Sequence, residues 1–431
     1  MIKRCLALLI GAFMFTVASA TVQEEFSLNP DLSGAYMLVY PYPAAPLPAL
    51  TAAPEGYVPF YINHYGRHGS RWLIGKKDYT EPIRLLEKAD SAGCLTPLGK
   101  RTLADLRTWL KLAEPRLGEL TDVGAEQHQG IARRMAQNFP EVFRGKDKVV
   151  RARSSVVIRC ILSMMNETSV LQSCFPMLNI HTDASQSDMS VLADGGHFKK
   201  LDALRKEARE KRGGSLYVVP FERFARTMMF DTSVLTDEEK SSLIHYMRQL
   251  AVSLQNHKTD YTLYQLFTDE ELFKMWANDN IESYIAFGNC PHARNLRPYQ
   301  QSHLLREMIT SADNVIANGG RAADLRFGHD VILMPLAVLM ELDDTNVSIE
   351  NFEDIAEQWQ NYNIFPMACN IQMVFYRPVS GDGEVLVKVL LNEHEARLPV
   401  ESDIAPYCKW SELRKYYLEK LEKMDAEYEK L

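Results

Sequence analysis

Apolar runs that alternate with amphipathic stretches mark the first half of the chain. The run from Tyr57 to Asn63 is almost wholly apolar, which predicts a buried strand. Helical spacing of apolar residues follows it, and two more short apolar runs come later. The predicted helices cover 79–92, 97–113, 121–138 and 154–171, and the two later strands cover 148–153 and 177–182. Alternation of strands and helices predicts an α/β fold with a mostly parallel sheet flanked by helices.

The strand pattern stops between Asp183 and Gly320, where the sequence is charged, helical and irregular. Apolar patterning then returns as strand 324–327, helix 331–341, the strands 369–376 and 384–391 of an edge hairpin, and an amphipathic helix over 410–431. We therefore expect an α/β core made of residues 21–184 and 321–431. Residues 185–320 are expected to form a mostly helical cap inserted into that core.

The first twenty residues have the pattern of an export signal. Lys3 and Arg4 precede an apolar run from Cys5 to Val17, and the small residues Ala18-Ser19-Ala20 follow it. The apolar run is too short to span a membrane comfortably, and no later run is long enough. We expect cleavage after Ala20 and a periplasmic or secreted mature protein with no membrane insertion.

The net negative charge limits which partners this chain can attract by long-range electrostatics. The formal net charge is −8, and loss of Lys3 and Arg4 would make it −10. An acidic protein is a poor general binder of nucleic acid or of anionic membranes. An anionic substrate would have to be attracted by a local basic pocket. The sequence gives no indication of the oligomeric state.

Six cysteines would remain after cleavage of the signal, and an oxidising compartment would permit disulfides among them. They are Cys94, Cys160, Cys174, Cys290, Cys369 and Cys408. Sequence cannot choose among the possible pairings, and several of these residues can equally be buried as small apolar side chains. No Cys-x-x-Cys spacing indicates zinc binding or thiol exchange.

The most informative short motif is Arg67-His68-Gly69-Ser70-Arg71, directly after the first predicted strand. Two permanent cations and an imidazole crowded at one strand end are unfavourable unless an anion binds between them. Arginine guanidinium groups bind phosphate oxygens two at a time, and a neutral histidine between them can attack phosphorus. The motif therefore indicates phosphoryl chemistry through a phosphohistidine. A solvated basic turn is the alternative for these five residues taken alone.

Three later segments join this motif in a recognisable order. They are Leu120-Thr121-x-x-Gly124-x-x-Gln127, Arg153-Ser154-Ser155-x-x-x-Arg159 and His329-Asp330. Together they resemble the motifs of the histidine acid phosphatases, a branch of the histidine phosphatase superfamily. The resemblance covers nearly all of the mature chain and implies a sheet like that of the phosphoglycerate mutases.

The resemblance also implies a role for each motif residue. His68 is expected to attack phosphorus through Nε2, and Asp330 is expected to donate a proton to the leaving alcohol. The phosphate ligands would be Arg67, Arg71, Arg153 and His329. Arg159 is expected to support the structure, and Ser154 or Ser155 to cap the next helix. No metal or cofactor is implied, because the arginines take that role.

Within the family, the sequence is similar to the inositol polyphosphate phosphatases and phytases. That branch usually has His-Ala-Glu where this chain has His329-Asp330, so the proton donor differs. Lys76 and Lys77 are candidates for binding further phosphates of such a substrate. The expected partner is a small anionic phosphomonoester, with inositol polyphosphate as the first choice and an acidic pH optimum.

Several alternatives remain open at this stage. A broad or sugar-phosphate acid phosphatase would carry the same motifs, and so would a non-catalytic binder of phosphate ligands. A mutase shares the first motif, although an export signal is unexpected for glycolysis. His394-Glu395 lacks the second histidine of a zinc-protease motif and is expected to be structural. His64, at the end of the first strand, is expected to be buried and structural.

Overall fold

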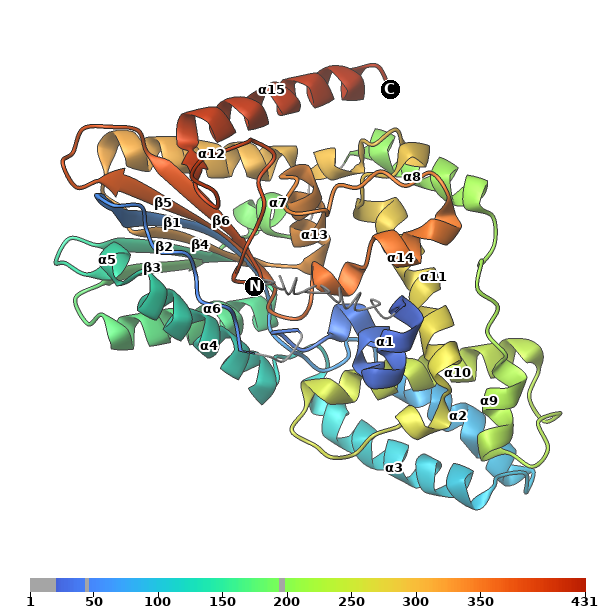
Figure 1. The fold of residues 1–431 in the computed structure, drawn as a ribbon. Coiled ribbons are helices and arrows are strands. Elements are labelled where there is room, and N and C mark those ends of the chain that lie inside the picture. The colour runs from blue at the N-terminus through green and yellow to red at the C-terminus, as the bar shows by residue number, and fades with distance from the viewer. Residues whose placement is uncertain (1–20, 43–45, 194–197) are drawn as a thin grey trace, which may run out of the picture.

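The computed structural model describes residues 21–42, 46–193 and 198–431. One sheet has the strand order β3-β2-β4-β1-β5-β6-β7, with β8 paired to β6, and lies at one side of the molecule (Figure 1). The strands are β1 (Tyr57–Arg67), β2 (Val149–Ser154), β3 (Asn179–Ala184), β4 (Ala323–Gly328), β5 (Asn370–Pro378), β6 (Leu386–Leu391), β7 (His394–Glu395) and β8 (Cys408–Lys409). Strands β1 to β4 are parallel, and β5 and β6 add the predicted antiparallel hairpin. The predicted α/β fold class is confirmed.

Helices cover both faces of this sheet because its inner strands are apolar on both sides. Helices α4 (Asp122–Asn138), α5 (Pro140–Phe143) and α6 (Ile158–Cys174) cover one face, and α12 (Ser302–Asn318), α13 (Asp330–Leu339) and α15 (Trp410–Glu429) cover the other (Figure 1). Neighbouring β1 residues divide between the faces. Tyr61 packs with the α12 side, and Ile62 packs with the α4 side.

A second hydrophobic core lies in a helical lobe beside the sheet. It joins apolar residues from four separate stretches of the chain, 22–38, 73–113, 224–277 and 356–367. The lobe contains α1 (Val22–Leu28), η1 (Pro30–Met37), α2 (Lys76–Ser91), α3 (Pro97–Ala113), α9 (Phe221–Met228), α10 (Asp237–Ser253) and α11 (Asp269–Phe287). The described part of 185–320 is mostly helical: besides α9, α10, α11 and α12 it contains α7 (Met189–Leu192) and α8 (Lys199–Arg212), joined by loops and short 3-10 helices. The domain boundaries at 184 and 321 stay a prediction.

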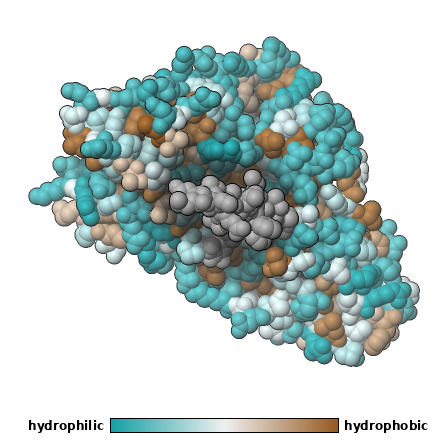
Figure 2. Space-filling view, viewed as in Figure 1, coloured by the Kyte–Doolittle hydropathy of each residue, from teal (hydrophilic) through white to brown (hydrophobic). Residues whose placement is uncertain are grey.

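Hydrophilic residues cover most of the molecular face that Figure 2 shows. None of the described helices is long and apolar enough to cross a membrane.

All six cysteines among the described residues have free thiols, and four of them are buried. The disulfides that an oxidising compartment would permit are not formed, while the predicted signal sequence, residues 1–20, lies outside the described residues.

Candidate active site

The Arg67–Arg71 motif lies where β1 ends, beside the carboxyl end of β4. The backbone N–H of His68 donates to the Gly328 carbonyl at 3.0 Å, which fixes the turn against β4. The His68 ring is 2 % exposed, and its Nδ1 lies 2.9 Å from the Gly69 carbonyl. That carbonyl can only accept, so Nδ1 carries the proton. Nε2 of His68 is then left with its lone pair, as a nucleophile requires.

Arg67 is held rigidly under the site by two backbone carbonyls. Its Nη1 donates to the Phe365 carbonyl and its Nη2 to the Tyr36 carbonyl, both at 2.7 Å. Nη2 also lies 3.2 Å from Oδ2 of Asp330. The Arg67 side chain is 1 % exposed, so its charge acts at short range in a weakly polar environment.

The carboxyl end of β4 supplies His329 and Asp330. The extended backbone of His329 precedes α13, and Asp330 is the first residue of that helix. Oγ of Ser155 lies 3.2 Å from Nε2 of His329, and the hydroxyl of Tyr65 accepts from the His329 backbone N–H at 3.1 Å. The His329 and His68 ring centroids are 5.6 Å apart. The nucleophile and the expected proton donor therefore meet at one end of the sheet.

Burial and positive charge set the ionisation of these groups. Burial lowers the pKa of His68 well below its usual value, and Arg67 and Arg159 lower it further. Burial and the charge of Arg159 likewise lower the pKa of His329 to about 4. Burial alone would raise the pKa of Asp330, but Arg67 and Arg71 bring it below its ordinary value. Without a bound anion, both imidazoles are neutral near pH 6 and Asp330 is ionised.

Three arginines lie near enough to His68 to lower its pKa by their charge, and Arg159 is one of them. Arg71 is 7 % exposed and donates to the Trp72 carbonyl at 3.0 Å. Arg159 stands in the first turn of α6, with Nη1 3.4 Å from the Gly118 carbonyl. Both lower the pKa of His68 through their charge, as Arg67 does. The structure thus brings Arg159 to the site, where the sequence had indicated only structural support.

Arg153, by contrast, is engaged elsewhere, and its prediction as a phosphate ligand needs correction. Its Nη1 lies 3.2 Å from Oδ1 of Asp188, and its Nη2 is paired with Glu307 of α12. The side chain therefore lies on the α12 face of the sheet. The strand continues through Ser154, and α6 begins only at Ile158, with Val157 as its N-cap residue. The predicted caps Ser154 and Ser155 are wrong, and the longer turn presents Arg159 in place of Arg153.

The two lysine candidates lie on the exposed start of α2. Lys76 pairs with Glu114 at 2.5 Å, and both side chains are about half exposed. Lys77 lies over the ring of Tyr246, 5.7 Å from its centroid. Neither lysine lines the cavity beside Asp330. Their predicted contact with substrate stays untested.

His64 is buried, as expected, while His394 is exposed on the edge strand β7. His64 is fully buried, and burial lowers its pKa to about 3. Glu395, next to His394 in β7, accepts from the Thr51 backbone N–H at 2.7 Å and from Lys388 at 2.8 Å. This carboxylate ties the edge of the sheet to an N-terminal segment.

The turn after His68 is held by α4 and α6. The Gly69 N–H donates to Oγ of Ser163 at 3.1 Å, and the Ser70 N–H donates to Oε1 of Gln127 at 2.8 Å. The backbones approach so closely that a Cβ on Gly124 would lie 2.2 Å from the Ser70 carbonyl oxygen. The segment around Gly124 and Gln127 thereby positions the loop that orients His68.

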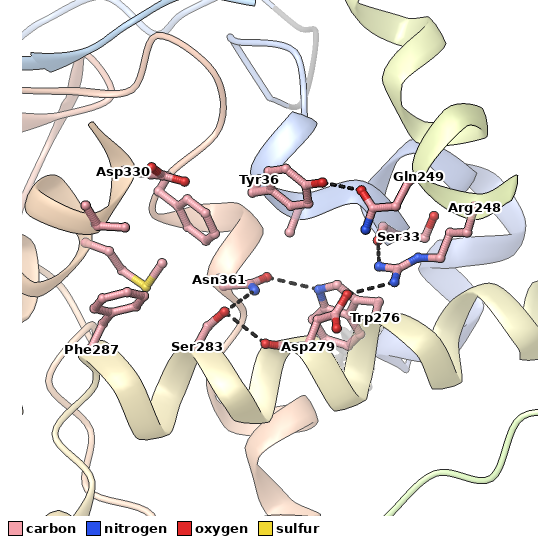
Figure 3. A pocket seen from close by; sticks show the side chains of 14 residues that line it. Ser33, Tyr36, Arg248, Gln249, Trp276, Asp279, Ser283, Phe287, Asp330 and Asn361 are labelled. Carbon is pink, nitrogen blue, oxygen red and sulfur yellow. Dashed lines mark hydrogen bonds and ion pairs between the residues drawn. The ribbon is translucent and has the colours of Figure 1, made fainter. Parts of the chain in front are cut away.

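A cavity of about 280 Å³ opens beside Asp330, between the sheet and the helical lobe (Figure 3). Its lining comes from η1, α10, α11, the start of α13 and two later residues. The lining residues are Ser33, Ala35, Tyr36, Arg248, Gln249, Trp276, Asp279, Ser283, Phe287, Asp330, Val331, Met334, Asn361 and Phe365. Sequence analysis identified Asp330 alone among these, because the others carry no local motif and lie far from His68 along the chain.

Comparison with known proteins agrees with this geometry. Residues 66–392 match the histidine phosphatase superfamily (branch 2). The fold is similar to the multiple inositol polyphosphate phosphatase of Bifidobacterium longum solved with inositol hexasulfate, at 18 % identity and a TM-score of 0.73, covering 89 % of this chain and 97 % of that one. It is also similar to the phytase of D. castellii, at 15 % identity and a TM-score of 0.67, covering 96 % and 90 %.

At these identities the solved structures support the fold alone, and among curated proteins no sequence matches this chain significantly. The family match spans every motif from the residue before Arg67 to beyond Asp330. This chain is therefore a member of branch 2 of the histidine phosphatase superfamily.

Proposed function

We propose that this protein is an exported phosphatase that hydrolyses phosphomonoesters through a phosphohistidine on His68. One observation carries the proposal: a histidine with a free Nε2 lies among three arginines, next to a carboxylate that opens into a cavity. Arginine charge suits the negative charge that spreads over phosphoryl oxygens in the transition state. The roles below follow from these positions.

In the first step, the lone pair of His68 Nε2 forms a bond to phosphorus while the bond to the leaving oxygen breaks. Arg67, Arg71 and Arg159 hold the phosphoryl oxygens, and Asp330 gives its proton to the leaving alcohol. In the second step, Asp330 takes a proton from water. The water oxygen then bonds to phosphorus, the N–P bond breaks, and phosphate leaves.

Asp330 is ionised in the free enzyme, so it can donate a proton only if substrate binding raises its pKa. A bound phosphate dianion would neutralise part of the charge of Arg67 and Arg71 that lowers the Asp330 pKa. Its pKa would then rise in the complex, and Asp330 would pick up a proton at mildly acidic pH. An acidic optimum for kcat is the expected consequence.

The proposed substrates are phosphorylated polyols. Inositol polyphosphates are supported by the names of the phosphatase and the phytase that share the fold. Phosphorylated sugars are the second candidate, because neutral polar side chains such as Gln249, Ser283 and Asn361 line the cavity next to Asp330. Phosphorylated sugars and partly phosphorylated inositols carry hydroxyl groups that can bond to these side chains, whereas inositol hexakisphosphate carries none.

Export rests on the N-terminal pattern and has its own test. The proposed cleavage point directly precedes Thr21, whose side chain caps α1 together with Glu24. N-terminal sequencing of protein recovered from outside the cytoplasm of an expressing bacterium should start at Thr21. An intact N-terminus starting at Met1 on the recovered protein would contradict the proposal.

The activity test is phosphate release at about pH 5 in excess EDTA, with p-nitrophenyl phosphate and inositol hexakisphosphate as substrates. A phosphatase of this mechanism should turn over in EDTA and lose turnover almost entirely in His68→Ala. A non-catalytic binder would release no phosphate, and His68→Ala would change only its affinity for phosphate. Turnover that survives in His68→Ala would refute the phosphohistidine mechanism.

A further inference from the structure

The cavity beside Asp330 is the place for the leaving group. Asp330 is the proposed proton donor, and its side chain, 25 % exposed, lines the cavity. A general acid must lie within hydrogen-bond reach of the oxygen that it protonates. The leaving alcohol must therefore enter the cavity, which we call the leaving-group pocket and define by the fourteen lining residues given above.

The leaving-group pocket has few charged side chains, and the anionic ones outnumber the cationic one. Among the described residues that line it, the charged side chains are Arg248, Asp279 and Asp330. Nη1 of Arg248 lies 2.7 Å from Oδ2 of Asp279, and its Nη2 donates to the Ser33 carbonyl (Figure 3). Both Nη atoms of this guanidinium are thus engaged by groups of the protein, while its buried Nε has no hydrogen-bond partner among the described residues. No other cationic side chain is among the described lining residues, and the charge of Arg71 reaches the pocket wall at Tyr36.

Asp279 is the group that a second phosphate would meet. Arg248 is 3 % exposed, whereas the Asp279 side chain is 53 % exposed. The carboxylate, not the guanidinium, is the accessible end of the pair. A carboxylate facing the ligand repels a phosphate and accepts hydrogen bonds from hydroxyl groups.

Neutral polar groups complete the pocket, and two sets of hydrogen bonds hold them. Nδ2 of Asn361 donates to Oγ of Ser283, and that hydroxyl donates to the Asp279 carbonyl at 2.9 Å. The Tyr36 hydroxyl is bonded to Gln249 across the pocket (Figure 3). Side chains held by one another keep their geometry before the ligand arrives, which lowers the entropy cost of binding a polyol.

We infer that the leaving-group pocket selects phosphorylated polyols that carry few phosphates, with Asp279 as the residue that disfavours a second phosphate near the reacting one. This inference rests on the proposed phosphatase function. Between the two proposed substrate classes, it favours phosphorylated sugars and inositols with few phosphates over highly phosphorylated inositols. The volume of the leaving-group pocket, about 280 Å³, lies just below the range typical of ligand pockets, about 300–1,000 Å³. Glucose 6-phosphate and inositol 1-phosphate have the expected chemistry.

The test compares kcat/KM for inositol 1-phosphate and inositol hexakisphosphate in the wild type and in Asp279→Asn. The wild type should prefer the monophosphate. Asp279→Asn should move the ratio toward the hexakisphosphate by about tenfold, the order expected when one charge close to another is removed near a protein surface. An unchanged ratio, or a wild type that prefers the hexakisphosphate, would overturn the inference.

Glu270→Gln is the matched control, since it removes one negative charge from the same helix α11 at an exposed position paired with Lys274. It should leave the ratio as in the wild type. A shift as large in Glu270→Gln as in Asp279→Asn would attribute the effect to net charge and contradict the inference. Hydrolysis of p-nitrophenyl phosphate separates the two proposals: its absence defeats the phosphatase function, and its presence with an unchanged ratio defeats the pocket inference alone.

Discussion

Replacing Arg159 and Arg153 in turn distinguishes the arginine that binds phosphate from the one that holds the fold. Arg159 lowers the pKa of both His68 and His329 through its charge, so it lies close to where phosphoryl oxygens would bind. Removal of one positioned donor to such a charge costs about 10²–10³ in kcat, or 2.7–4 kcal/mol. Arg159→Ala should therefore lose most activity while the protein stays folded.

Arg153→Ala should show the opposite pattern. Its loss breaks the ion pairs with Asp188 and Glu307, but Glu307 keeps Arg326 at 3.0 Å. Charged hydrogen bonds of this kind contribute about 1.5–3 kcal/mol, which should appear as a lower free energy of unfolding. Thermal unfolding and steady-state hydrolysis of p-nitrophenyl phosphate measure the two effects separately. An inactive, stable Arg153→Ala beside an active Arg159→Ala would refute the assignment.

Three further predictions concern the support of the site. Gln127→Leu and Ser163→Ala should each lower kcat about 10- to 100-fold with little change in KM, the cost typical of lost outer-shell hydrogen bonds. A rise in KM as large as the fall in kcat would contradict a role in orienting the His68 loop. Gly124→Ala should lower the melting temperature far more than Gly130→Ala on the same helix, because the new Cβ would meet the Ser70 carbonyl at 2.2 Å in one case and the flexible end of Arg134 in the other. The free energy of unfolding should fall as pH drops below 6.5, because the His64 pKa is about 3 in the folded state and near 6.5 when unfolded, so protonation favours the unfolded chain. His64→Leu should flatten that decline between pH 7 and 4, as measured by chemical denaturation at each pH. An unchanged dependence of the free energy of unfolding on pH in this variant would contradict the argument.

Much of the core was predictable from local patterns. Apolar runs predicted β1, β2, β3 and β4 to within four residues at each end, because strands inside such a sheet are rich in apolar residues. Thr121 caps α4 as its sequence position predicts, accepting from the Gly124 N–H. The motif residues then meet because the carboxyl ends of parallel strands lie at one edge of the sheet.

The site was predictable only where its residues follow strands directly. Arg153 and Arg159 lie six positions apart on either side of a turn, and the exact end of β2 decides which one faces the substrate. Ser154 and Ser155 resemble helix caps, but here they extend the strand and the turn. Successive side chains of a strand point to opposite faces of the sheet. The sequence alone does not show which face a residue at the strand end occupies, or which face binds the ligand.

The leaving-group pocket could not be predicted, because its residues come together only in the tertiary fold. Tyr36, Gln249 and Asn361 stand on η1, α10 and η9 (Asn361–Asn363). Each looks in sequence like an ordinary amphipathic or surface position. The second hydrophobic core, which packs η1 against α10 and α11, is what places these side chains around Asp330.

Trapping the covalent intermediate tests the central claim most directly. Enzyme mixed with p-nitrophenyl phosphate is quenched in alkali, which preserves phosphohistidine, and the peptide that contains His68 is analysed by mass spectrometry. The account predicts a phosphoryl group on His68, with more of it in Asp330→Asn, because that variant cannot take the proton from water in the second step. Turnover without phosphate on His68, or phosphate on another residue, would contradict the account.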